Sequence, residues 1–210
     1  MILKKFNKTK IILIVVPIII FIFLVVAISA GFSNNFETWV YNGAVEHMSP
    51  TLNIIIKGIT NLGGAISVMI FCSILLIYSK TRKKIGVPVS IAVIISEIIN
   101  IILKNIFARE RPNILQLVNE TSYSFPSGHS MVNATIYTML AILAIKYIKD
   151  KRKKCIVVMF CTIFPLLIGF TRIYLGVHYF TDVLGGLLLG FVISVIVYTL
   201  LKKDDTEFIT

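Results

Sequence analysis

Cysteine is scarce in this sequence, and the few cysteines form no recognisable site. The three cysteines, Cys72, Cys155 and Cys161, lie in or beside apolar runs, and no two of them have the spacing of metal ligands. An odd number at these spacings indicates neither a disulfide framework nor a zinc site. We interpret all three as small packing residues.

Acidic residues are also scarce. The chain has 10 Asp and Glu against 21 Lys and Arg, which gives a formal net charge of +11. Such an excess could indicate a nucleic-acid partner, but the basic residues form short clusters between apolar runs. Clusters in these positions orient a membrane protein and favour contact with anionic lipid headgroups. We therefore expect a lipid bilayer as the partner and no nucleic acid.

Apolar residues are abundant instead, at 57% of the 210 residues, and they form long runs. A helix of about 20 apolar residues spans the hydrocarbon core of a bilayer. A helix also satisfies its own backbone in lipid, whereas a lone strand does not. The runs therefore predict an all-α bundle of six transmembrane helices in a single domain, 1–210. The predicted helices are roughly 11–30, 62–79, 85–105, 130–148, 155–171 and 179–201.

The charges predict how this bundle lies in the membrane. The first run is longer than the apolar part of a usual signal peptide, so we interpret 11–30 as a retained helix. Most basic residues fall on one side of the six-helix topology, and the positive-inside rule makes this side, with both termini, cytoplasmic. We expect a multi-pass protein of the cell membrane. The clusters are Lys4, Lys5, Lys8 and Lys10; Lys80, Arg82, Lys83 and Lys84; Lys146, Lys149, Lys151, Arg152, Lys153 and Lys154; and Lys202 and Lys203.

The orientation rule leaves some basic residues of the outer side unexplained, and most of these stand in motifs at predicted helix ends. One motif, KNIFARERP (104–112), ends the third helix; a second, PSGH (126–129), opens the fourth. A third, RIYLGVHYFTD (172–182), joins the fifth and sixth helices. The topology brings all three motifs to the outer face, where we expect the active site. The unexplained residues are Lys57, Lys104, Arg109, Arg111 and Arg172.

The residue types in these motifs suit the binding of a phosphate group. A phosphomonoester carries up to about two negative charges, which Lys104, Arg111 and Arg172 can neutralise. Ser127 and Gly128 stand where a helix begins, and free N–H groups and the helix dipole favour an anion there. Glycine at position 128 would let the backbone approach closely.

Two histidines complete the predicted site. His178 and Asp182 are four residues apart, so on a helix they share a face, and the carboxylate can hold the imidazole in one tautomer. This predicts His178 as a nucleophile that takes the phosphoryl group, with His129 as the general acid for the leaving alkoxide. Because the cationic residues supply the charge stabilisation, we expect no metal and no other cofactor.

Each of these residues has a simpler explanation when it is taken alone. A membrane histidine is more often structural, an outer arginine often anchors to headgroups, and a Pro-Ser-Gly turn is common where helices begin. These explanations do not account for the joint occurrence of all three motifs on one membrane face.

Together the motifs resemble the signature of the type-2 phosphatidic acid phosphatase superfamily. That signature is a Lys, six residues and Arg-Pro; then Pro-Ser-Gly-His; then Ser-Arg, five residues, His, three residues and Asp. Here it reads Lys104…Arg111-Pro112, then 126–129, then Arg172…His178…Asp182, with Thr171 in place of the usual Ser. The stretches 61–64 (NLGG), 122–131 (SYSFPSGHSM) and 174–186 (YLGVHYFTDVLGG) are similar to the bacterial phosphatidylglycerophosphatase B type.

The resemblance implies a lipid phosphatase with a phosphohistidine on His178 and a general acid at His129. Its substrates would be lipid phosphates or isoprenoid pyrophosphates: phosphatidylglycerophosphate, undecaprenyl pyrophosphate or phosphatidic acid, among which the sequence does not choose. A phosphotransferase using the same phosphohistidine is the alternative. A transporter is more remote, because it would carry ionisable or broken positions near the bilayer midplane. The sequence gives no oligomeric state.

Some other residues receive weaker interpretations. Phe36, Trp39, Val40, Ala44 and Met48 recur at helical spacing and predict an interfacial helix within the outer loop 31–61. Glu97 shares a helix face with Lys104, about 10 Å away at 1.5 Å per residue, and either makes a polar contact within the bundle or supports the site. We expect Arg109 to anchor to headgroups and His47 to be solvated. The sequence assigns no role to Tyr123, Ser124 or Asn133.

Overall fold

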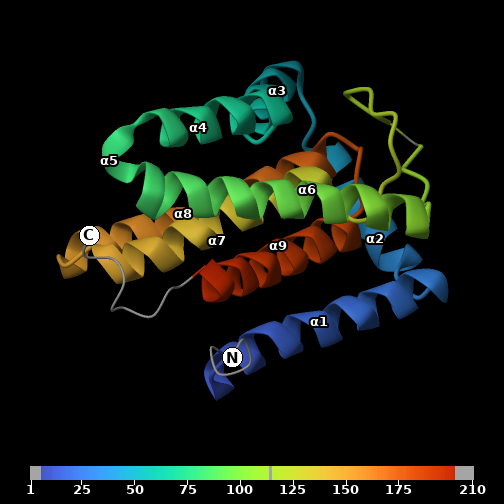
Figure 1. The fold of residues 1–210 in the computed structure, drawn as a ribbon. Helices are drawn as coiled ribbons and strands as arrows, with labels where there is room; N and C mark the ends of the chain where they lie inside the picture. Colours follow the sequence, from blue (N-terminus) through green and yellow to red (C-terminus); the bar gives the residue numbers. More distant parts are fainter. Residues whose placement is uncertain (1–5, 114, 202–210) are drawn as a thin grey trace.

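The computed structural model describes residues 6–113 and 115–201, and these residues form helices and connections but no strand (Figure 1). The predicted all-α class is thus confirmed. Lys4, Lys5, Lys202 and Lys203 of the predicted basic clusters lie outside the described residues. The helices are α1 (Lys8–Ser29), α2 (Asn34–Glu46), α3 (Pro50–Leu62), α4 (Ala65–Ile77), α5 (Ser79–Thr81), the π-helical turn η2 (Arg82–Gly86), α6 (Val87–Phe107), α7 (Gly128–Tyr147), α8 (Lys151–Tyr174) and α9 (Phe180–Leu201).

Five helical segments in the described part are long and apolar enough to cross a membrane, and a sixth results if α3 and α4 count as one span. These two helices meet at an angle of 41°. The helix predicted over 62–79 corresponds to α4, and a break at Gly63 and Gly64 separates it from α3. A β-carbon at Gly63 would lie 2.7 Å from Ile168 Cγ2, so the break lets α8 approach closely.

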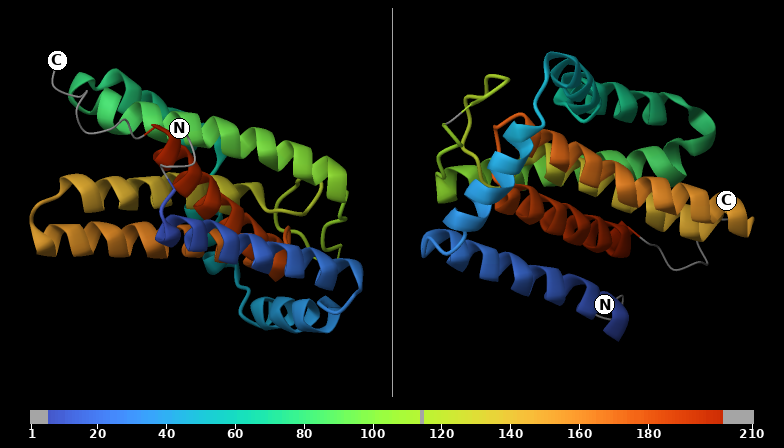
Figure 2. Two further views of the ribbon diagram at one scale, coloured as in Figure 1. Left: turned by 60° about the horizontal axis from the view of Figure 1, so that its bottom comes forward. Right: turned by 180° about the vertical axis from the view of Figure 1, so that it is seen from behind.

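The connection between α1 and α3 contains the helix predicted there, α2. Figure 2 shows α2 crossing one end of the bundle between α1 and α3. Trp39 is 71% exposed on its outer surface, whereas Tyr41 and Ala44 are buried against the bundle. This split into an exposed and a buried face fits a helix at a membrane surface.

Helix α7 lies at the centre of the bundle and packs against α6, α8 and α9, while α1 packs mainly against α9. Glycines bring α9 unusually close to α7. A β-carbon at Gly186 would lie 2.6 Å from the carbonyl oxygen of Ser127, and one at Gly190 would lie 2.3 Å from that of Met131. Small residues permit such approaches between helices in membranes. The contact at Ser127 fixes the start of α7 against the start of α9.

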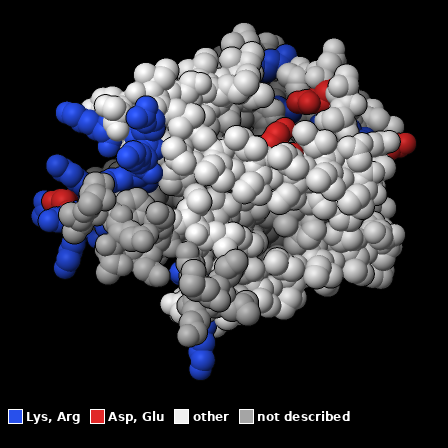
Figure 3. Space-filling view, in the orientation of Figure 1, with Lys and Arg blue, Asp and Glu red and all other residues white. Residues whose placement is uncertain are grey.

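The bundle has two chemically different ends. Lys and Arg side chains gather at one end, and the broad surface between the ends is nearly free of charge (Figure 3). We call this end, with α5, η2 and the α7–α8 connection, the basic end. The opposite end, where α6 and α8 finish and α7 and α9 begin, we call the site end. All three sequence motifs lie at the site end.

Candidate active site

The site end brings the predicted residues together from four helices and their connections. Lys104 lies in the last turn of α6 and Arg172 in the last turn of α8, while His129 opens α7 and Asp182 opens α9. A cavity of about 440 Å³ lies among them. Of the predicted site residues, it is lined by Lys104, Arg111, Gly128, His129 and His178.

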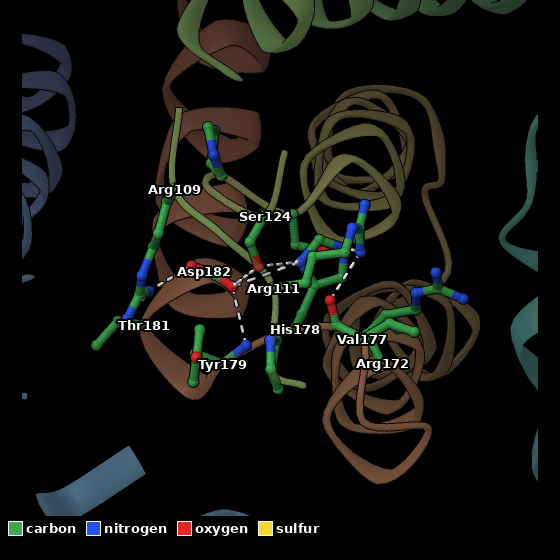
Figure 4. A network of polar contacts seen from close by, with 12 residues as sticks. Arg109, Arg111, Ser124, Arg172, Val177, His178, Tyr179, Thr181 and Asp182 are labelled. Carbon is green, nitrogen blue, oxygen red and sulfur yellow. Dashed lines mark hydrogen bonds and ion pairs between the residues drawn. The ribbon is translucent and has the colours of Figure 1, made fainter. Parts of the chain in front are cut away.

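His178 faces two different groups through its two ring nitrogens (Figure 4). Its Nδ1 lies 3.5 Å from Asp182 Oδ2 and 3.3 Å from Ser124 Oγ, and its Nε2 lies 3.2 Å from Arg111 Nη1. The prediction that His178 and Asp182 share a helix face is wrong, because α9 begins only at Phe180. The turn before α9 achieves the pairing instead, since the N–H of Tyr179 donates to Asp182 Oδ2 at 2.8 Å.

Lys104 and Arg111 are held side by side by the segment between α6 and α7. Lys104 Nζ donates to the carbonyl oxygen of Tyr123 at 2.5 Å and to Ser122 Oγ at 2.9 Å. Arg111 donates to the carbonyl oxygens of Ser122 and Val177, each at 2.7 Å. These bonds hold two cationic groups in the lining of one cavity, and Arg111 lies next to the Nε2 atom of His178.

Arg172 is not part of the cavity lining and is 2% exposed. Its Nη1 donates to Thr60 Oγ1 at 3.0 Å, and its Nη2 pairs with the carboxylate of Glu120. Glu120 also lies 3.7 Å from Arg111 Nη2, so one carboxylate bridges two of the three predicted phosphate-binding cations. Sequence reasoning missed Glu120, because nothing in its local pattern distinguishes it from a solvated loop residue.

Ser127 has a structural role at the start of α7. Its hydroxyl accepts hydrogen bonds from the N–H and hydroxyl of Ser130 at 3.4 and 3.0 Å, and its own N–H donates to the carbonyl oxygen of Asp182 at 3.0 Å. The side chain is fully buried. Ser127 therefore organises the helix start, and the N–H groups of Gly128 and His129 are those placed by helix geometry for an anion.

Burial and neighbouring charges shift the pKa values of His178 and Glu120, which lie in the connections between helices. Burial lowers the pKa of His178 from 6.5 to about 4, although the hydrogen bond and charge of Asp182 oppose this effect. His178 is therefore neutral at neutral pH, as a nucleophile must be. Burial raises the pKa of Glu120, but the guanidinium groups of Arg172 and Arg111 outweigh it and hold this pKa below its ordinary value.

The expectation that Arg109 anchors to headgroups is wrong. Its Nη1 donates to Asp182 Oδ1 at 2.5 Å, and its Nη2 pairs with Glu37 Oε2 at 2.7 Å. Ser124, which received no role from the sequence, donates a hydrogen bond to the other oxygen of Asp182. Both residues reach Asp182 from more than fifty positions away, so no local pattern could have revealed them.

Glu97 lines the same cavity as Lys104 and is exposed rather than packed into the bundle. Its position favours support of the site over a polar contact within the bundle. Among residues 6–113 and 115–201, no group of three or more His, Cys, Asp or Glu side chains is arranged to hold a metal ion.

The profile of the PAP2 superfamily matches residues 83–205, which include all three motifs. Phosphatidylglycerophosphatase B of Bacillus subtilis is 33% identical over 190 residues, which cover 86% of this chain and 92% of that protein. Undecaprenyl-diphosphatase of Sulfolobus acidocaldarius is 31% identical over 128 residues, 58% of this chain and 57% of that protein.

The fold is similar to a crystal structure of a transmembrane PAP2-type phosphatidylglycerolphosphate phosphatase from Bacillus subtilis. The TM-score is 0.82 at 32% sequence identity, and the match covers 89% of this chain and 94% of that chain.

Proposed function

The chain belongs to the PAP2 superfamily and resembles its membrane lipid phosphatases, and we propose that it hydrolyses the terminal phosphate of a lipid phosphomonoester or pyrophosphate through a phosphohistidine on His178. The family membership confirms the resemblance that the three sequence motifs indicate. One observation carries the mechanism: Nε2 of His178 faces Arg111, which lines the cavity, while its Nδ1 faces Asp182 and Ser124.

Binding begins with the cationic groups. Lys104 and Arg111 line the cavity, and the buried Arg172 pairs with Glu120, which also lines it. A phosphate group that enters takes over the guanidinium contacts that Glu120 makes with Arg111 and Arg172. Arginine suits this exchange because its planar fork matches phosphate oxygens as well as carboxylate oxygens. The fixed cations then stabilise the charge that develops on the transferred group.

The first chemical step is the attack of His178 Nε2 on phosphorus. The P–N bond forms as the bond from phosphorus to the leaving oxygen breaks, and His129 gives that oxygen a proton. Asp182 accepts the Nδ1–H hydrogen bond and stabilises the cationic phosphohistidine. In the second step His129 takes a proton from water, the water oxygen attacks phosphorus, and the P–N bond breaks to release inorganic phosphate.

The cations of the site supply the charge stabilisation that a divalent metal supplies in other phosphatases. We therefore propose that the reaction is independent of metal ions. We also propose that the site end faces the outside of the cell. The gathering of Lys and Arg at the opposite end supports this orientation through the positive-inside rule.

Phosphate release by the purified protein in detergent with EDTA tests this function. The substrates are phosphatidylglycerophosphate, undecaprenyl pyrophosphate and phosphatidic acid, with His178→Ala as the inactive control and Arg152→Ala, at the basic end, as the matched active control. We expect release from at least one lipid with wild type and Arg152→Ala, and none with His178→Ala. A strict requirement for a divalent metal would contradict the proposed charge stabilisation.

The same assay separates hydrolysis from phosphotransfer. Release of inorganic phosphate without an added alcohol supports hydrolysis. Activity that appears only when an acceptor alcohol is supplied would instead assign the phosphohistidine to a phosphotransferase.

A further inference from the structure

The Asp182 carboxylate is shared between two different neighbours. Its Oδ2 faces His178 and accepts hydrogen bonds from Tyr179 and Ser124, while its Oδ1 accepts from Arg109 Nη1 at 2.5 Å (Figure 4). Because Asp182 is fully buried, the orientation of its carboxylate is set by these partners rather than by water. Arg109 is the cation that binds Oδ1, the carboxylate oxygen of Asp182 that is turned away from His178.

Arg109 is itself held from the far side by α2. Its Nη2 pairs with Glu37 Oε2 at 2.7 Å, and the side chain of Glu37 is only 2% exposed. Thr181 connects the two, since it accepts a hydrogen bond from Arg109 at 2.8 Å and donates one to Glu37. The guanidinium also stacks on the ring of Tyr179 at 4.2 Å from its centroid. The Arg109 side chain is therefore fixed in both position and orientation.

None of these groups lines the cavity of the site. The cavity that contains His178 and His129 includes neither Arg109 nor Glu37. Glu37 is followed on α2 by Trp39, which is 71% exposed, and Phe36 of the same helix packs against Phe180 at the start of α9. The chain of contacts Glu37–Arg109–Asp182–His178, in which only Arg109 is partly exposed, thus joins a surface helix to the proposed nucleophile.

We propose that Arg109 is a positioning residue that holds the Asp182 carboxylate in line with His178, and that Glu37 of α2 anchors this guanidinium. The inference rests on the proposed role of His178 and adds to it a contact from Glu37, which lies outside the three motifs. It also gives α2 a function beyond covering the bundle, because a displaced α2 would release Arg109 and with it Asp182.

Loss of a charge and simple loosening of the site predict different effects on the protonation of His178. The positive charge of Arg109 offsets part of the negative charge of Asp182 at His178, and Glu37 in turn offsets part of the charge of Arg109. Loss of Arg109 should therefore make His178 easier to protonate, and loss of the Glu37 charge should make it harder. The other charged or titratable groups that face His178 are Arg111 and Glu120 of the loop, Arg172 of α8, His129 of α7 and Lys104 of α6.

A titration of His178 by NMR, with isotope-labelled histidine in detergent micelles, tests this directly. The chain has only three histidines, so the signal of His178 is assigned by its loss in His178→Gln. We expect Arg109→Gln to raise the titration midpoint of His178 by roughly one pH unit, the usual scale for a nearby charge. We expect Glu37→Gln to shift it downward, and Glu46→Gln, an exposed position on the same helix, to leave it unchanged.

Opposite shifts in Arg109→Gln and Glu37→Gln support the inference. Upward shifts of the His178 midpoint in both variants would mean that each substitution merely opens the site to water. No shift in either variant would mean that Arg109 and His178 are not linked. Each of these two results would overturn the proposal. The titration needs no substrate. A wild-type protein that releases no phosphate from any lipid would therefore refute the proposed function without deciding this inference.

Arg109→Lys covers the case in which Arg109→Gln does not fold. Lysine keeps the charge but cannot reach Asp182 and Glu37 at once with a planar fork. We expect the midpoint of His178 to stay near the wild-type value while kcat falls roughly tenfold at an unchanged KM, because orientation is lost without charge. A kcat equal to that of wild type would contradict a positioning role.

Discussion

Lys and Arg are more numerous at the basic end than at the site end, and the two sets of side chains also differ in burial and in partners. At the basic end Lys80, Arg82, Lys151 and Arg152 are exposed and spread over the surface. At the site end Lys104 and Arg172 are buried, and defined acceptors hold their charges. Exposed basic residues orient a membrane protein, whereas buried cations that converge on one cavity can hold an anion.

The difference shows what Lys and Arg side chains need in order to take part in a reaction. A buried charge is costly unless it is paired and hydrogen-bonded. At the site end Glu120, Glu37 and Asp182 supply that pairing, so the cations remain charged and oriented before a substrate arrives. Such preorganisation is what makes fixed charges effective in catalysis. The basic end has no comparable set of buried acids among its described residues.

Removal of the two histidines should have the largest effect on the site end. We expect His178→Gln to lower kcat/KM by at least about 10⁴-fold, because glutamine cannot take the phosphoryl group. His129→Gln should lower it by roughly 10²- to 10⁴-fold, the usual contribution of a general acid. Phosphate release measures both, and size-exclusion profiles in detergent check that the variants fold. Near-normal turnover in either variant would contradict the mechanism.

Neutralisation of one arginine at each end tests the comparison directly. Arg172→Gln should lower kcat by roughly 10²- to 10³-fold, as for the loss of one preorganised donor to a developing charge. Arg152→Gln should leave kcat and KM unchanged, because this exposed side chain lies at the basic end. Steady-state kinetics on the same lipid give both values. Equal losses in the two variants would show that total positive charge matters rather than its placement.

The pH dependence should show the smallest but most specific effect. Burial places the pKa of His178 at about 4, below its ordinary 6.5, so the neutral nucleophile persists as the pH falls through 6 and is lost only near 4. We expect kcat/KM, corrected for ionisation of the substrate phosphate, to show no acid limb from His178 near pH 6.5. An acid limb near pH 6.5 that remains after this correction and is caused by His178 would mean that His178 is solvated.

The sequence was sufficient for the helical class, for most of the spans and for the three motifs. Long apolar runs and clustered charges are local signals, and the motifs are short enough to be seen directly. The break at Gly63 and Gly64 was missed because the hydropathy of a segment carries no information about where another helix, here α8, approaches it. Helix α3, Pro50–Leu62, was missed because its 13 residues are shorter than the apolar run expected of a span.

The residues that support the site were the least predictable. Arg109, Ser124 and Glu120 act through partners distant in sequence, and each taken alone is typical of a solvated loop. Ser127 was assigned to the phosphate, but in the structure it caps α7. A motif identifies residues that occur together, whereas only the folded arrangement separates those that line the cavity from those that hold the lining in place.

The central claim is a phosphohistidine on His178, and trapping this intermediate tests it most directly. Enzyme mixed with lipid that carries a radiolabelled terminal phosphate is quenched in denaturant with EDTA present, and protein-bound label is mapped to its peptide. We predict label that is stable in base and lost in acid, as for a P–N bond, on the peptide with His178. His129→Gln should retain such label longer and His178→Gln should carry none. Rapid phosphate release by wild type without any protein-bound label, or label that persists in His178→Gln, would contradict the account.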